Sequence, residues 1–195
     1  IRISKALDEG MLSTFHYFGI ADLSINNTRL DNASDFNKIS INEKALQIID
    51  NAIYYGTDSG VTRGLVFCSS NSESQSLSEI FNKNEFNTIS LSGNNTEEER
   101  IDAINKLESD NPNEKLDYIF TVDIFNEGID IPKVNQVIMV RPTESAIVFI
   151  QQLGRGLRKL DSKHYLTVLD FIGNYKNNYL IPIALFGDNT YNKDK

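Results

Sequence analysis

Short apolar runs alternate along the chain with stretches in which apolar residues recur every three or four positions. The first pattern predicts buried strands, and the second predicts amphipathic helices that pack on them. The predicted strands span residues 14–20, 64–68, 86–91, 116–122, 134–140 and 165–171. Strands that alternate with helices are typical of a mostly parallel sheet with helices on both faces, so the predicted fold class is α/β.

Two of the predicted helices begin at a capping box, in which a hydroxyl residue is followed three positions later by a glutamate. Ser40 with Glu43 forms one such pattern and Thr96 with Glu99 the other. Gly56 is the expected end of the first helix, because glycine commonly terminates helices. The other predictions are helices around residues 77–81 and at 145–153, and a polar loop over 21–39.

A chain of 195 residues is long enough for one sizeable core. We expect an incoming interdomain linker at residues 1–13, one domain at 14–187 and a polar tail at 188–195. The chain begins with Ile1 rather than Met, so we expect a piece of a longer protein. The single cysteine, Cys68, allows no internal disulfide. With no apolar run of membrane-spanning length and no export signal, we expect a cytoplasmic location and no membrane partner.

The chain is acidic, with 27 Asp and Glu against 19 Lys and Arg and a net charge of −8. This balance argues against a broad basic surface for nucleic acid but leaves room for a narrow groove. Against that background Arg155 and Arg158 lie three positions apart, within the stretch FIQQLGRGLRK at 149–159. Residues three apart share a helix face, and guanidinium groups suit phosphate. The turn therefore predicts a phosphate contact, with a solvated charged face as the alternative.

Small polar residues follow several of the predicted strands, where ligands bind in open parallel sheets. Ser69 and Ser70 follow the strand at 64–68, and Ser92 and Gly93 follow the strand at 86–91. Such residues are also common in ordinary loops, so each has a structural explanation as well. Asp170, at the end of an apolar strand, is either functional or a cap. No Cys and His cluster supports a metal site.

Four segments in order strengthen the functional reading: GLVFCSS, SLSG, FTVDIFNEGIDIP and FIQQLGRGLR. They resemble motifs IV, IVa, V and VI of the second RecA-like domain of superfamily 2 helicases and translocases. The amino-acid sequences of the last two segments are most similar to those of bacterial DEAD/DEAH-type helicases, near the type I and III restriction translocases. The resemblance covers about residues 60–175 and implies a RecA-like sheet. It also implies an NTP phosphohydrolase that uses ATP and Mg2+, both bound mainly by the N-terminal RecA-like domain of the same polypeptide.

The resemblance also assigns roles to individual residues. Arg158 would be the arginine finger that reaches the γ-phosphate of ATP, and Arg155 would contact the same phosphates. Gln151 would link to the nucleotide or the partner domain, while Gly128 and Asp130 would line the ATP cleft. The expected contacts to the nucleic-acid backbone are Ser69, Ser70, Ser92 and Gly93.

Motif VI begins here with Gln151 and Gln152 rather than the His-Arg of DEAD-box proteins, which favours DNA over RNA as the partner. The chain contains no GxxxxGK[ST] loop, so we expect it neither to bind ATP tightly nor to hydrolyse it alone. The favoured prediction is the second motor domain of a DNA helicase or translocase. The alternatives are the same domain of an RNA helicase, and a non-catalytic α/β scaffold module that binds another anion.

Overall fold

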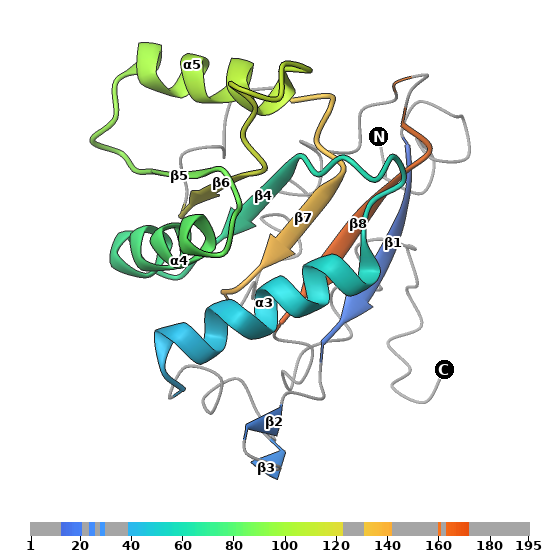
Figure 1. Ribbon diagram of the computed structural model, residues 1–195, viewed down its shortest axis with the longest axis vertical. Coiled ribbons are helices and arrows are strands. Elements are labelled where there is room, and N and C mark those ends of the chain that lie inside the picture. Colours follow the sequence, from blue (N-terminus) through green and yellow to red (C-terminus); the bar gives the residue numbers. More distant parts are fainter. Residues whose placement is uncertain are drawn as a thin grey trace, which may run out of the picture.

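The computed structural model describes residues 13–20, 24–25, 28–29, 39–122, 131–141, 160 and 163–171. Six strands form one sheet in the order β1-β8-β7-β4-β6-β5, and every neighbouring pair is parallel (Figure 1). The strands are β1 (Thr14–Gly19), β4 (Gly64–Phe67), β5 (Thr88–Leu91), β6 (Tyr118–Thr121), β7 (Gln136–Met139) and β8 (Tyr165–Asp170). Each lies inside a predicted strand range, which confirms the α/β prediction.

The described helices are α3 (Ile41–Tyr55), α4 (Asn71–Lys83) and α5 (Glu97–Glu108). Both predicted capping boxes are present, at Ser40 before α3 and at Thr96 before α5. The backbone N–H of Gly56 donates to the Ala52 carbonyl at the end of α3, as expected for its C-cap. The predicted helix at 145–153 lies outside the described residues.

The predicted loop at 21–39 contains a short antiparallel pair, β2 (Ser24–Ile25) with β3 (Thr28–Arg29). Prediction missed this pair because two residues are too few to show an alternating pattern. Among the described helices, none is long and apolar enough to cross a membrane.

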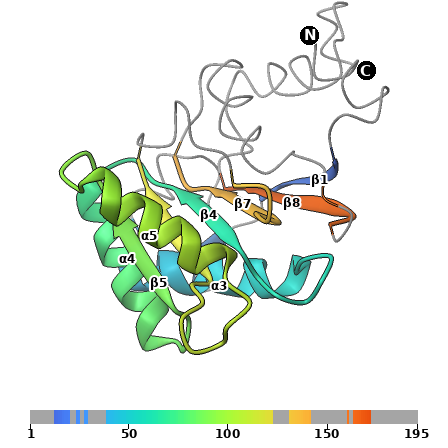
Figure 2. The same cartoon turned by 90° about the horizontal axis from the view of Figure 1, so that it is seen from above.

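Helices cover the two faces of the sheet in separate clusters. Strand residues such as Val66 and Ile138 pack with apolar residues of α3 and α4, whereas Leu65 and Val137 pack with those of α5. Figure 1 shows α3 crossing in front of β7 and β8. Figure 2 shows the same helix on one side of the layer formed by β4, β7, β8 and β1. Because successive side chains of a strand point to opposite faces, apolar runs without alternation are what a sheet covered on both sides requires.

The buried side-chain amide of Gln136 links α3 to the sheet. The Gln136 amide nitrogen donates to the carbonyls of Ala52 and Gly56, each at 3.1 Å, and its oxygen accepts from the Tyr118 hydroxyl at 2.6 Å. Gln136 is fully buried, so these bonds replace water that the side chain has lost. The amide therefore fixes the end of α3 against β6 and β7.

Candidate functional site

The carboxyl ends of the parallel strands lie at one edge of the sheet. The residues predicted to contact a nucleic-acid backbone follow β4 and β5 at this edge. Phe67 of β4 and Leu91 of β5 are both paired with Thr121 of β6, so β6 separates the two strands. Strand spacing then places the residues after β4 and after β5 about 10 Å apart. Figure 1 shows the arrowheads of β4, β7 and β1 pointing toward the same edge. We call this the carboxyl edge.

Ser69 and Ser70 are held at this edge by a network that we call the Glu73 clamp, formed by Lys44, Ser69 and Glu73. The backbone N–H of Ser69 donates to one carboxylate oxygen of Glu73 at 2.8 Å, and the Lys44 ammonium donates to the other at 2.7 Å. Ser70 is the N-cap of α4, and its hydroxyl accepts from the Glu73 backbone N–H at 3.1 Å. The Ser69 N–H is therefore already occupied by Glu73, and the predicted contact of Ser69 and Ser70 with a nucleic-acid backbone stays a prediction.

Ser92 and Gly93 belong to a turn that satisfies most of its own polar groups. The Ser92 backbone N–H donates to the Asn95 side-chain oxygen at 2.8 Å, and Asn95 N–H donates back to the Ser92 carbonyl at 3.2 Å. Arg100 reaches the turn from α5 and donates to the carbonyls of Ser92 at 3.4 Å and Gly93 at 3.1 Å. Its buried Nε has no hydrogen-bond partner among the described residues. Sequence reasoning missed Arg100, because its contacts depend on how α5 packs beneath the turn.

Gly93 is exposed, and nothing among the described residues requires it to be glycine. A Cβ built there meets no heavy atom within 4 Å, and Gly93 is not among the residues with positive φ. Neither close packing nor the left-handed backbone conformation therefore explains the residue. Open space at this position leaves room for an outside group to approach the backbone, and the nucleic-acid contact of Gly93 stays a prediction.

A surface depression reaches from the first residue of α4 to the turn after β5, and Ser92 is the predicted contact residue in its lining. This open depression of about 470 Å³ runs between α4 and β5, and its lining includes Asn71, Ser92 and Asn94. Hydroxyl and amide groups dominate this lining, which holds one carboxylate, Glu79, and no lysine or arginine among the described residues. Such a surface offers mostly neutral hydrogen bonds beside one negative charge, and no positive field from its described lining.

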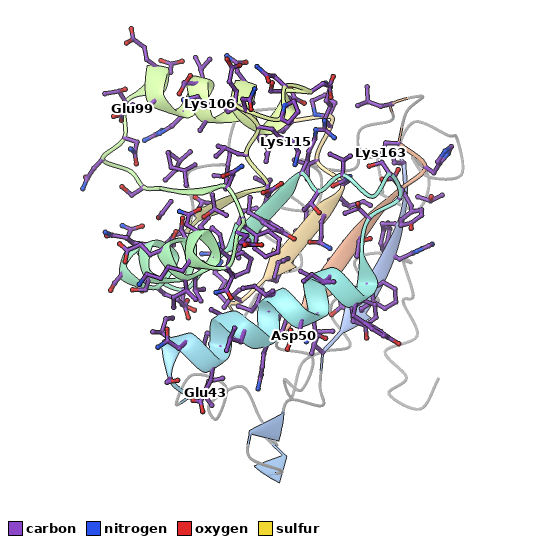
Figure 3. All side chains as sticks on the ribbon, in the orientation of Figure 1. Glu43, Asp50, Glu99, Lys106, Lys115 and Lys163 are labelled. Atoms are coloured by element: carbon purple, nitrogen blue, oxygen red, sulfur yellow. The ribbon has the colours of Figure 1, made fainter. Side chains whose placement is uncertain are left out.

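Three basic residues, Arg63, Lys133 and Lys163, lie instead at the opposite, amino edge. Arg63 and Lys133 contact Asp110 at 2.6 and 3.0 Å and line a cavity of about 280 Å³ together with Lys163. Hydrogen bonding and charge from Lys133 hold the pKa of the Asp110 carboxyl below its usual range. Figure 3 shows Lys163 at this edge and Glu43 at the far one. These ion pairs are internal, so we assign them no ligand.

Five predicted site residues lie outside the described residues, namely Gly128, Asp130, Gln151, Arg155 and Arg158. The chain leaves the carboxyl edge toward them at Val122, after β6, and at Arg141, after β7. Their roles therefore stay predictions.

Two other residues of the carboxyl edge have defined surroundings. Asp170 is buried and accepts a hydrogen bond from the Tyr17 hydroxyl at 2.7 Å, which joins β8 to β1. Burial, followed by the Asp170 charge, raises the pKa of Tyr17. Cys68 is fully buried, and burial raises the pKa of its thiol, so it is a core residue rather than a nucleophile. The described residues contain no group of three or more His, Cys, Asp or Glu that could hold a metal ion.

The chain is similar to known proteins in both sequence and fold. The family model described as "Helicase conserved C-terminal domain" matches residues 43–159. A Saccharomyces cerevisiae protein, provisionally named ATP-dependent helicase IRC3, is 29% identical over 161 residues. That alignment covers 83% of this chain and 21% of the relative, so the chain spans about a fifth of the yeast protein.

Two solved structures show the same fold. The ATP-dependent Type ISP restriction-modification enzyme LlaBIII, bound to DNA, matches with a TM-score of 0.62 at 18% identity. This match covers 95% of the chain and 14% of the enzyme. The C-terminal domain of the DEAD-box protein Dbp5 matches with a TM-score of 0.60 at 16% identity, over 91% of this chain and 86% of that domain.

Proposed function

The chain belongs to the helicase conserved C-terminal domain family, and we propose that it is the second motor domain of an ATP-dependent DNA helicase or translocase. One observation carries the proposal beyond the family. The parallel sheet brings Ser69 and Ser70 to the same edge as Ser92 and Gly93, about two strand spacings apart. Open space at Gly93, and the hydroxyl and amide groups of Ser92 and Asn94 in the depression, support contact with a nucleic-acid backbone.

In this proposal, ATP and Mg2+ bind mainly to the N-terminal RecA-like domain of the same polypeptide. Arg158 and Arg155 approach the γ-phosphate from this chain, with Gln151, Gly128 and Asp130 along the cleft. Phosphoryl transfer depends mostly on positioning and on charge stabilisation, which a guanidinium from a second domain supplies. Closure of the two domains around ATP, and their opening after hydrolysis, would then move a strand held at the carboxyl edge.

The choice of DNA rests on the start of motif VI, where Gln151 and Gln152 depart from the DEAD-box pattern. The fold does not separate the two polymers, because a DNA-bound restriction enzyme and a DEAD-box domain match about equally well. An ATPase assay of the full-length protein with single-stranded DNA, duplex DNA and RNA separates them. We expect DNA to raise ATP turnover. Stimulation by RNA alone would favour the RNA helicase, and the absence of ATP turnover under all conditions would favour the scaffold module.

A bulky residue at Gly93 is expected to weaken nucleic-acid binding without loss of stability. In Gly93→Val the side chain enters space that the domain leaves open, so the melting temperature should stay within about 2 °C of the wild type. The branched side chain would keep a phosphate from the backbone and raise the DNA concentration for half-maximal ATPase stimulation about tenfold. Thermal unfolding and a DNA titration measure the two effects. Unchanged DNA dependence would exclude a close contact at Gly93.

A further inference from the structure

The outer face of α3 exposes a cluster of large apolar side chains. Leu46 is 48% exposed, Ile53 64% and Tyr54 81%, and the buried residues of the helix lie on its opposite side. Asp50 lies among them, because positions three and four apart share a helix face, and Figure 3 shows it on α3. Single exposed apolar residues are common on proteins, whereas a cluster is typical of an interaction surface. We call these four residues the α3 patch.

A row of aromatic rings continues from the α3 patch across the edge of the sheet. Tyr54 contacts Tyr55 with ring centroids 5.0 Å apart, and Tyr55 stacks on Phe18 of β1 at 4.2 Å. From Phe18 the row continues to His16 at 6.3 Å, and from His16 to Tyr165 of β8 at 4.3 Å. All five side chains are at least partly exposed. The faces of aromatic rings attract cations, so this aromatic row favours a positively charged ligand.

The charges around the α3 patch are negative. Asp50 has no ion-pair or hydrogen-bond partner among the described residues. Lys44 is the single basic residue of α3, and it is buried against Glu73. The last turn of α3 contains no basic residue, whereas α4 has Lys83 there and α5 has Lys106. Because the C-terminal end of a helix carries a partial negative charge, this end and Asp50 together attract a cation.

This combination of groups selects among the possible occupants. A nucleic-acid backbone would meet a carboxylate without any basic residue of the patch to neutralise its phosphates. A second copy that packed through the same face would bring the two Asp50 carboxylates together, again without a compensating cation. A guanidinium, in contrast, can stack on an aromatic ring and donate to a carboxylate, and Asp50 and Tyr54 offer both groups one helical turn apart.

We propose that the α3 patch and the aromatic row form a docking surface for a protein segment that carries arginine among apolar residues. Apolar side chains of the segment pack on Leu46 and Ile53, and its guanidinium lies between Asp50 and the Tyr54 ring. The surface adjoins the amino edge of the sheet, because Gln136, the first residue of β7, binds the end of α3. It lies away from the carboxyl edge, so the inference does not depend on the proposed function.

The test uses the full-length protein and a fluorescent hexapeptide of alternating leucine and arginine, acetylated and amidated at its ends. Anisotropy titrations at about 0.1 M salt screen charges more than about 10 Å away. Tyr54→Ala and Asp50→Asn should each weaken peptide binding about threefold, and the double variant about tenfold. Tyr54→Phe keeps the ring and should bind as the wild type does. Melting temperatures should stay within about 2 °C of the wild type, because these side chains are exposed.

The matched control is the double variant Glu98→Gln with Ile101→Ala, which removes one exposed carboxylate and one exposed apolar side chain from α5. Because α5 packs on the other face of the sheet, this control should bind the peptide as the wild type does. A second peptide with lysine in place of arginine should bind about threefold more weakly, since an ammonium has no planar face to stack on Tyr54. ATP turnover of the double variant at Asp50 and Tyr54 should equal that of the wild type.

The inference is overturned by a wild type that does not bind the arginine peptide, or by a double variant at Asp50 and Tyr54 that binds it as tightly as the α5 control. Equal affinity for the lysine peptide would indicate charge attraction alone and would also overturn it. Sedimentation without peptide tests for a second copy, and a dimer that the double variant lacks would replace the proposed partner. These results leave the motor function intact, whereas a full-length protein without ATP turnover would remove that function and leave the docking surface.

Discussion

Replacement of Arg158 by alanine in the full-length protein is expected to lower kcat for ATP hydrolysis about 10³-fold or more. The proposed guanidinium stabilises charge that develops on the transferred phosphoryl group, so its loss acts mainly in the transition state. Nucleotide affinity should fall much less, and kcat and kcat/KM should decrease together. Steady-state kinetics at saturating nucleic acid, with nucleotide binding measured separately, provide both quantities.

Arg158→Lys should rescue this defect poorly, because a single ammonium cannot reproduce the planar, two-pronged guanidinium. Arg63→Ala is a suitable control, since Arg63 is paired with Asp110 at the amino edge of the sheet, away from the carboxyl edge. Its kcat should match the wild type at temperatures where the variant is folded. Normal hydrolysis by Arg158→Ala would end the arginine-finger assignment and leave the motor proposal resting on the family and on motif V.

Replacement of Gly64 by alanine is expected to destabilise the domain by about 3 kcal/mol or more. A Cβ at Gly64 would lie 2.1 and 2.3 Å from two ring carbons of Tyr118, far inside van der Waals contact. Tyr118 cannot easily move away, because it is 1% exposed and its hydroxyl is bonded to Gln136 at 2.6 Å. A loss of this size should lower the melting temperature of the 195-residue chain by about 6 °C or more.

Gly93→Ala provides the internal comparison for this experiment. Its new methyl group would meet no heavy atom within 4 Å, so the same chemical change should leave the melting temperature nearly unaltered. Equal melting temperatures for the two alanine variants would show that β4 and β6 can separate at Gly64 without cost. That result would contradict the close packing of Tyr118 against the strand.

The elements that prediction located correctly share a local origin. Ser40 and Thr96 mark the starts of helices. Each hydroxyl accepts from the backbone N–H of the glutamate three residues later, and that glutamate accepts from the backbone N–H of the hydroxyl residue. The strand at 64–68 is visible because a strand covered on both faces needs a continuous apolar run. In both cases the physical signal spans only a few neighbouring residues, so tertiary contacts are not needed to read it.

The site could be predicted only as a set of strand endings. Alternation of strands and helices implies parallel strands, and parallel strands end at one edge, so Ser69 and Ser92 were expected on the same side. The strand order was not predictable, because β5 pairs with β6 rather than with β4 and no local pattern records that choice. The distance between the two contact regions therefore required the sheet itself.

The amino-acid pattern alone was sufficient for the fold class, the six strands of the main sheet, the described helices and the edge at which chemistry is expected. Only the folded chain decided that Glu73 binds Ser69 and Lys44, that Arg100 supports the turn at Gly93, and that Gln136 joins α3 to the sheet. Helix caps and buried strands depend on short-range geometry, which the sequence contains directly. The polar bonds link residues up to 84 positions apart, and their partners depend on how the layers pack against one another.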